Sequence, residues 1–331
     1  MRATRRAMLA GGFSGLAALA APRRPRAQAA SAAGYPDRPV RLIVPFTAGG
    51  AGDIVGRLLA AYLQTELGKP FVVENRPGAG SALGVEQIAR ATSDGYTIGM
   101  ANIASHAILP NLRQLPYDPV KDFAPVGMVA LTPCLLVVNP DRLPIRSVAE
   151  LVERAKAAPD ALDFSSSGAG TSLHLGMEMF MQAAGIRMTH IPFNGSGPSL
   201  QALLAGQVAL SMEVAAVAWP QIQDGKLRAL AVTTPQRAAF APDLPTLEES
   251  FPGTAIAPWH GLVAPSGTPK PIIDKLAAAT ANFLKQPETL ARFQQQTLEP
   301  KGAGPAEFAA FIQDESKTFA EVIRRGNVTV N

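Results

Sequence analysis

A glycine-rich stretch near the start of the chain has residue types suited to binding an anion. It follows an apolar run, Val40 to Val44, precedes apolar residues at helical spacing, and reads Pro45-Phe46-Thr47-Ala48-Gly49-Gly50-Ala51-Gly52-Asp53-Ile54-Val55-Gly56. The pattern predicts a strand, a tight turn and a helix, with Asp53 as the N-cap. First-turn N–H groups lack partners and lie at the positive end of the helix dipole, so the stretch is a candidate anion site. A plain strand-to-helix connection is the alternative.

Three further joints between expected strands and helices contain small polar residues. They fall at residues 102–106, 166–174 and 194–199, and like residues 46–53 they contain no Lys or Arg. Backbone N–H groups, hydroxyls and waters would therefore make the contacts to a ligand. A site of this composition suits a carboxylate.

A Rossmann-type NAD(P)-dependent dehydrogenase is the main enzymatic alternative. The spacing Gly50-x-Gly52-x-x-x-Gly56 lies between a strand and a helix, and Glu74 ends the next expected strand, where an acid would bind a ribose. Tyr117 and Lys121 have the spacing of a short-chain dehydrogenase pair. Pro119 lies between them, however, and prevents a regular helical turn.

Hydrolase and metal sites lack the spacings that they require. Asn194-Gly195-Ser196-Gly197 is not the G-x-S-x-G of a nucleophile elbow. The histidines are scattered without an H-E-x-x-H pattern, and a single cysteine, Cys134, excludes a cysteine cluster. We therefore expect no catalytic residue, no metal and no cofactor.

The first 29 residues are predicted to be an export signal. Paired arginines, Arg5-Arg6, precede a short apolar run, and Ala27-Gln28-Ala29 is a cleavage site of the A-x-A type. The paired arginines, with three more before the cleavage site, favour the twin-arginine route to the periplasm. This segment holds six arginines and no acidic residue, so the rest of the chain has 24 basic against 26 acidic side chains. Without a basic stripe, nucleic-acid binding is not expected.

Strand and helix patterns alternate along the chain, which predicts a two-domain α/β protein. Each domain is expected to hold a mostly parallel sheet flanked by helices, with the ligand cleft between the domains. Two apolar runs separated by Thr132-Pro133 indicate one crossing, residues 235–258 are expected to be irregular, and helices over 269–293 and 305–325 return to the first unit. Domain 1 is thus predicted over 30–132 and 260–331, and domain 2 over 133–259, as in a hinged clamp.

A series of motifs recurs in order between Tyr35 and about residue 325. They read Tyr35-Pro36-Asp37-Arg38-Pro39, Ile43-Val44-Pro45-Phe46, Val73-Glu74-Asn75-Arg76-Pro77-Gly78-Ala79-Gly80, Asp94-Gly95-Tyr96, Leu115-Pro116-Tyr117-Asp118-Pro119, Leu227-Arg228-Ala229-Leu230-Ala231-Val232-Thr233, and Gly261-Leu262-Val263-Ala264-Pro265 with Gly267-Thr268-Pro269. In these motifs the chain resembles the solute-binding receptors of tripartite tricarboxylate transporters, the Bug-type periplasmic binding proteins. The resemblance implies a type II periplasmic-binding-protein fold. It also implies a non-enzymatic, monomeric receptor that captures a mono- or dicarboxylate and delivers it to the permease subunits of a membrane transporter.

The resemblance, with the polar joints above, places ligand-binding residues in both domains. In domain 1 they are Phe46, Thr47, Gly49, Gly50, Asp53, Asn102, Ser105 and His106, and in domain 2 they are Ser166, Ser167, Gly170, Thr171, His174, Asn194, Gly195, Ser196, Pro198 and Glu213. Two departures affect the expected pocket: Phe193-Asn194-Gly195 stands where the family usually has Tyr-Lys-Gly, and Glu213 stands where an aspartate is common. The identity of the acid therefore does not follow from a relative. A dehydrogenase and a ligand sensor without a transport role are the alternatives.

Overall fold

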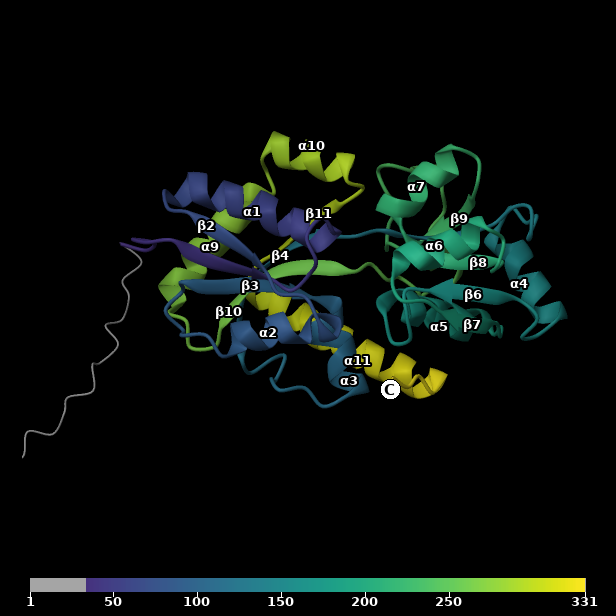
Figure 1. Ribbon diagram of the computed structural model, residues 1–331, viewed down its shortest axis with the longest axis horizontal. Helices are drawn as coiled ribbons and strands as arrows, with labels where there is room; N and C mark the ends of the chain where they lie inside the picture. Colours follow the sequence, from purple (N-terminus) through teal and green to yellow (C-terminus); the bar gives the residue numbers. More distant parts are fainter. Residues whose placement is uncertain (1–33, 331) are drawn as a thin grey trace, which may run out of the picture.

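The computed structural model describes residues 34–330, and the predicted export signal over 1–29 lies outside them. Two β-sheets lie one after the other along the longest axis, each with helices on both sides (Figure 1). We call the six-stranded sheet with its helices the first lobe and the five-stranded sheet with its helices the second lobe. No helix within residues 34–330 is both long enough and apolar enough to cross a membrane.

The sheet of the first lobe has the strand order β11-β4-β10-β3-β1-β2. Its strands are β1 (Val40–Val44), β2 (Phe71–Asn75), β3 (Thr97–Asn102), β4 (Phe123–Leu131), β10 (Trp259–Pro265) and β11 (Glu299–Ala303). The strands of the first alternating repeat, β1, β2 and β3, are parallel, whereas β10 runs antiparallel to both β3 and β4. The sheet is therefore mixed and not mostly parallel as predicted, because β10, which returns from the second lobe, and β11 both run in the opposite direction.

The helices of the first lobe come from both ends of the chain. They are α1 (Ala51–Leu67), α2 (Ala82–Ala89), α3 (Leu109–Leu112), α9 (Lys270–Phe283), α10 (Pro287–Gln295) and α11 (Pro305–Gly326), with a 3₁₀ turn at Ala79–Ser81 and a π-helical turn at Ala104–Ile108. The prediction of one helix over 269–293 was wrong. Pro287 starts a new helix, since proline is favoured in the first turn but excluded from helix interiors.

The sheet of the second lobe has the order β7-β6-β8-β5-β9. Its elements are β5 (Cys134–Val138), α4 (Val148–Ala157), β6 (Asp163–Ser166), α5 (Ser172–Ala184), β7 (Thr189–Pro192), α6 (Ser196–Leu204), β8 (Leu210–Val214), α7 (Ala215–Gln223), β9 (Arg228–Val232) and α8 (Leu247–Ser250). Here too the sheet is mixed, because β5 is antiparallel to β8 and β9 while β6 is parallel to β7 and β8. Residues 235–258 were predicted to be irregular but contain α8, whose Thr246 and Glu249 form a capping box.

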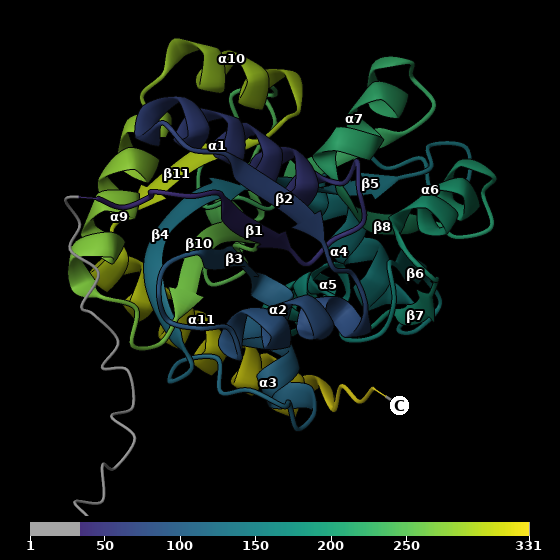
Figure 2. The same ribbon diagram turned by 60° about the vertical axis from the view of Figure 1, so that its left-hand side comes forward.

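The two lobes are joined at three places. The chain leaves the first lobe after β4 and returns before β10, and the two crossings are tied together where Thr132 N donates to Pro258 O at 2.7 Å. The third junction is α11, which packs on β4 and, farther along, on α5 of the second lobe (Figures 1 and 2). Phe319 of α11 and Met177 of α5 belong to one apolar core that continues from lobe to lobe. The two lobes are therefore packed together through a shared apolar core on the side of α11.

Candidate functional site

A cleft of about 620 Å³ lies between the two lobes. The first lobe contributes the start of α1 and β10, and the second lobe contributes the starts of α5, α6 and α7. The lining residues are Phe46, Gly49, Gly50, Ala51, Gly52, Ile54, Thr132, Ser167, Ser172, Leu173, Ser196, Val214, Ala216, Val217, Pro258, His260, Gln296 and Leu298. This volume is typical of a small-molecule site.

Four helices begin at this cleft, so several unpaired backbone donors meet there. In α1 the first intrahelical bond runs from Ile54 N to Gly50 O at 3.0 Å, which leaves the amides of Ala51 and Gly52 without intrahelical acceptors. The N-cap of α6, Gly195, has no side chain to satisfy its first-turn amides. Each helix dipole adds partial positive charge at its start. The arrangement therefore attracts an anion.

The cleft carries no formal charge of its own. Within residues 34–330, no lining residue is Lys, Arg, Asp or Glu. The lining has a single titratable group, His260, and burial lowers its pKa to about 4, so the imidazole is neutral near pH 7. The helix starts alone supply the positive potential, which favours an anion such as a carboxylate over a cation.

The first-lobe wall of the cleft depends on close packing around Phe46. Its ring lies over Gly52, where a Cβ would collide with the ring carbons, so glycine is required at this position. The edge of the same ring meets His260, with centroids 5.3 Å apart and planes at 82°. Asn75 Nδ2 donates to the Phe46 carbonyl at 3.0 Å. These contacts fix the turn that presents the start of α1.

Asp53 stabilises this turn from behind the cleft. The prediction that Asp53 is the N-cap was wrong, because Gly50 is the N-cap and Asp53 lies inside the first turn. Its carboxylate accepts bonds from Gly49 N (2.8 Å), Arg57 Nε (2.9 Å) and Asn75 Nδ2 (2.7 Å). Burial opposes ionisation, but these hydrogen bonds outweigh it and lower the pKa of Asp53. Asp53 thus orders the turn and lies outside the lining.

Glu213 lies behind the second-lobe side of the cleft. It is fully buried on β8, and its Oε1 accepts bonds from Ser199 Oγ (2.6 Å) and Ser211 Oγ (2.9 Å). Its Oε2 has no hydrogen-bond partner among residues 34–330. Burial raises the pKa of Glu213 to about 7, although the two serine hydroxyls act in the opposite direction. Glu213 is not a lining residue.

The structure brings some of the sequence-predicted site residues to the cleft. Those that line it are Phe46, Gly49, Gly50, Ser167 and Ser196. Others belong to the same loops and helix starts but lie outside the lining, namely Thr47, Asp53, Thr171, Asn194, Gly195 and Pro198. As ligand contacts, all of these stay predictions.

The remaining predicted residues are packed inside the lobes and are not among the lining residues. In the first lobe Asn102, Ser105 and His106 are buried, with Ser105 Oγ 2.9 Å from His106 Nδ1. In the second lobe Ser166 Oγ lies 2.7 Å from His190 Nε2, and Gly170 N donates to His174 Nδ1 at 3.1 Å. These contacts shape the loops that lead to the cleft.

Sequence reasoning missed the lining residues on the two crossings and at the start of α7. They are Thr132, Val214, Ala216, Val217, Pro258 and His260, together with Gln296 and Leu298 near β11. No glycine-rich turn or polar joint precedes them in the sequence. The helix α7 was missed because Pro220 lies inside it, in a segment that reads as a strand end.

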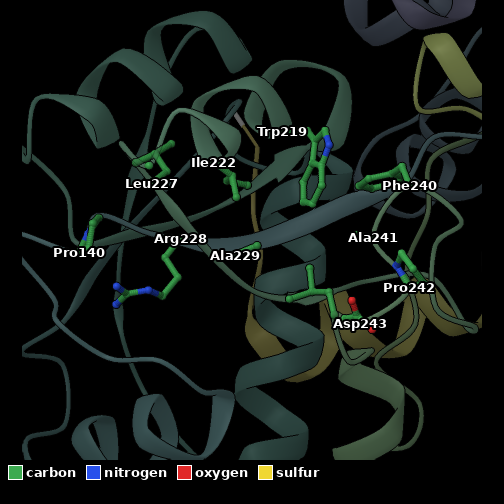
Figure 3. A pocket seen from close by; sticks show the side chains of 12 residues that line it. Pro140, Trp219, Ile222, Leu227, Arg228, Ala229, Phe240, Ala241, Pro242 and Asp243 are labelled. Carbon is green, nitrogen blue, oxygen red and sulfur yellow. The ribbon is translucent and has the colours of Figure 1, made fainter.

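A second hollow of about 610 Å³ lies on the second lobe alone (Figure 3). Trp219 and Phe240 form one side of it, with ring centroids 5.0 Å apart, and Arg228 Nη1 is held by the Ile145 carbonyl at 2.8 Å. The hollow lacks helix starts and lacks residues from the first lobe among those described. The interlobe cleft is therefore the better candidate site.

The family model described as the tripartite tricarboxylate transporter family receptor matches residues 55–328. The chain belongs to this family. Among curated relatives, Protein BugT of Bordetella pertussis (strain Tohama I) is 36% identical over 293 residues, covering 88% of this chain and 90% of the relative. Among solved structures, R. palustris Rpa4515 with adipate superposes with a TM-score of 0.78 at 34% identity, covering 89% of this chain and 99% of that one. MatC from Rhodopseudomonas palustris with bound malate gives a TM-score of 0.73 at 32% identity, covering 87% and 100%.

Family membership makes the chain a tripartite tricarboxylate transporter receptor, a solute-binding protein and not an enzyme. The resemblance seen in the sequence motifs and the two-lobed α/β fold of periplasmic binding proteins are both confirmed. The dehydrogenase interpretation was wrong. The two residues of its candidate pair have different partners: the Tyr117 hydroxyl donates to Ser105 O at 2.9 Å, and Lys121 pairs with Asp118 at 3.1 Å.

Proposed function

We propose that this receptor binds a mono- or dicarboxylate in the interlobe cleft and delivers it to the permease subunits of a tripartite transporter. The observation that carries the proposal is the meeting of four helix starts in a cleft without charged side chains. Two relatives solved with adipate and with malate support the same class of ligand.

In this proposal the carboxylate accepts hydrogen bonds from first-turn amides, including those of Ala51 and Gly52. The hydroxyls of Ser172 and Ser196 are available from the facing lobe, and waters complete the shell. Closure would exclude bulk water and strengthen these interactions, since the field of a helix start is weakly screened in a low-dielectric site. Selectivity between acids would then depend on the shape and polarity of the cleft beyond the carboxylate.

The proposal includes movement of the two lobes. Within the residues that the structure describes, 34–132 with 260–330 would form one rigid body and 133–259 the other, with the tied crossings at Thr132 and Pro258 as the hinge. An acid that contacts both lobes binds the closed state better and shifts the population toward it. Monomeric action in the periplasm and export by the twin-arginine route are further parts of the proposal.

A thermal-shift screen of the purified receptor tests the ligand class. Mono-, di- and hydroxycarboxylates are compared with the corresponding amides and with NAD(H). An acid that binds only the native state raises the melting temperature, by an amount equivalent to about 2.7 kcal/mol at 100 times its Kd. We expect a rise with at least one acid and none with its amide. A rise with NAD(H) and with no acid would refute the proposal.

The substitution Gly50→Val tests the position of the carboxylate. A Cβ at Gly50 meets only the Thr47 carbonyl, at 3.7 Å, and the residue has an ordinary extended backbone (φ −79°, ψ 166°). We expect affinity for the best acid to fall about tenfold or more, because the valine side chain would occupy space that the carboxylate needs at the helix start. Gly304→Val is the matched control, because Gly304 is also an extended N-cap glycine (φ −71°, ψ 176°) with open space around it, but lies at α11 outside the cleft. Equal affinities in the two variants would contradict this placement.

A further inference from the structure

His260 combines three features that no general role in packing explains. It lines the cleft at the beginning of β10, its side chain is buried, and the pairing of β10 with β4 shifts register between His260 and Gly261. Such a bulge redirects a side chain at the end of a strand. Its Nε2 lies 3.2 Å from Thr132 Oγ1, on the other crossing between the lobes. Its Nδ1, although buried, has no hydrogen-bond partner among the residues that the structure describes.

Asn102, on the neighbouring strand, also has a buried side-chain atom without a hydrogen-bond partner among the described residues. Asn102 and His260 are directly opposed on the antiparallel strands β3 and β10, so their side chains stand on the same face of the sheet. The Asn102 Oδ1 accepts a bond from Ser105 N at 3.1 Å, while its buried Nδ2 finds no acceptor within residues 34–330. A buried polar group without a partner lowers stability, and here two such groups are on directly opposed residues of neighbouring strands, one of which lines the ligand cleft.

The two unpaired atoms have complementary chemistry. Asn102 Nδ2 is a donor only. His260 is neutral because burial lowers its pKa to about 4, and when its Nε2–H donates to Thr132 Oγ1 its Nδ1 is an acceptor. One hydroxyl oxygen placed between them accepts from Asn102 and donates to His260. A methylene group leaves both atoms unpaired, and a second carboxylate finds no cation to balance its charge.

We propose that His260 and Asn102 form a neutral polar subsite that binds a hydroxyl substituent of the acid and so makes this receptor select hydroxylated over unsubstituted carboxylates. The inference rests on the proposed carboxylate function and specifies its ligand class. His260 supplies the selective contact from the cleft wall, and Thr132 is a positioning residue that holds the imidazole through Nε2. Because Thr132 lies on one of the two crossings between the lobes, a ligand hydroxyl bound at His260 would lie next to the proposed hinge.

The test is isothermal titration calorimetry with acid pairs that differ by one hydroxyl: malate and succinate, lactate and propionate, 2-hydroxyadipate and adipate, mandelate and phenylacetate. For the pair with the tightest member, we expect the hydroxylated acid to bind about tenfold or more tightly, the consequence of pairing otherwise unsatisfied buried groups. Equal or tighter binding of the unsubstituted acid in every pair would overturn the inference. If no acid binds, the carboxylate proposal itself fails.

Three substitutions distinguish a polar binding role of His260 from a role in packing alone. In His260→Asn the side-chain amide occupies the position of Nδ1, and in His260→Gln it reaches the position of Nε2. His260→Phe removes both polar atoms. We expect the preference for the hydroxylated acid to persist in the Asn variant and to disappear in the Gln and Phe variants. Thr280→Val is the control, because Thr280 Oγ1 is also buried without a hydrogen-bond partner among the described residues but lies on α9, outside the cleft lining. Loss of the preference in the control, or its retention in all three variants, would contradict the role of Nδ1.

Discussion

Two buried carboxyl groups, Asp53 in the first lobe and Glu213 in the second, lie behind helix starts that face the same cleft. Asp53 receives hydrogen bonds from a backbone amide, a guanidinium and a side-chain amide, and its pKa is lowered. Glu213 receives two serine hydroxyls on one oxygen and nothing on the other among the described residues, and its pKa is raised to about 7.

The difference shows that burial alone does not determine the charge of a carboxyl group. The donors to Asp53 include a cation and groups that cannot reverse their hydrogen-bond direction, so they stabilise the ionised form. Serine hydroxyls can donate or accept, and they compensate less for the loss of water around Glu213. The first helix start is thus organised by an anion that is already neutralised by Arg57. The second is kept free of negative charge below about pH 7, which favours an anionic ligand nearby.

The largest expected effect comes from Asp53→Ala. The substitution removes the acceptor for Gly49 N, Arg57 and Asn75, and we expect a loss of about 2 to 3 kcal/mol of unfolding free energy, at about 1 kcal/mol for each bond. Acid affinity should fall as well, because the turn before α1 loses its order. Chemical denaturation and calorimetry measure the two effects. Asp53→Asn keeps one acceptor oxygen, so its unfolding free energy should lie between those of wild type and Asp53→Ala. If both variants were as stable as wild type, the Asp53 carboxylate would not be stabilised by its donors as described, and it would not differ from Glu213.

Glu213→Gln is expected to stabilise the receptor, with a distinctive pH dependence. The folded pKa of about 7 lies above the ordinary value of 4.5, so stability is unaffected below pH 4.5, falls as the pH rises to 7, and stays reduced above it. The amide mimics the protonated acid, so the variant should exceed wild type by at most about 3 kcal/mol at pH 8 and match it at pH 4.5. Denaturation at several pH values measures this difference.

The matched control for this prediction is Glu153→Gln, at an exposed glutamate on α4. It should leave the pH profile of stability unchanged. A Glu213→Gln variant that gains no stability at high pH would show that Glu213 is ionised in the folded receptor, as Asp53 is. Asp53 should respond to pH in the opposite direction. Because its pKa is lowered in the folded receptor, its ionised form contributes stability, and this contribution is lost as the pH falls through the folded pKa.

The smallest effect is expected for Arg57→Ala. The guanidinium is half exposed, and exposed ion pairs contribute about 0 to 1 kcal/mol. Asn75→Ala should cost more, since Asn75 Nδ2 contacts both the Asp53 carboxylate and the Phe46 carbonyl. The ratio of the two losses in denaturation experiments shows whether Asp53 is held mainly by the ion pair or by the amide network. A larger loss in Arg57→Ala would favour the ion pair.

Local sequence patterns predicted the parts of the fold that depend on local physics. The strand, turn and helix over 40–67 follow from an apolar run, glycines and helical spacing, all within one short segment. The exact cap was missed because aspartate is a good N-cap by type, whereas the extended backbone of Gly50 starts the helix earlier. The strand β11 contains Pro300 and Gly302, which weaken any strand pattern, and forms only because β4 offers an edge.

The candidate site was less predictable, since its decisive contacts join distant segments. Thr132 and His260 are 128 positions apart, and Asn102 meets His260 only through the pairing of β3 with β10. A single histidine in an apolar strand carries no local indication of either partner. In contrast, Gly49, Gly50, Ser167 and Ser196 reach the cleft lining because each lies at a strand-to-helix joint, a position that sequence alone identifies.

The insertion of β10 between β3 and β4 has a consequence for biosynthesis. All strands of the second lobe are contiguous in the chain, but the first sheet needs a strand that is translated after residues 133–258. Until then β3 and β4 have open edges toward each other, the kind of exposed backbone that promotes mispairing and recruits chaperones. The second lobe is therefore able to mature first, and the first lobe closes last around the strand that begins with Trp259 and His260. A chain that ends before residue 259 would hold all strands of the second lobe but would lack β10 and the helix α11 that packs on α5, and so would have no complete ligand cleft.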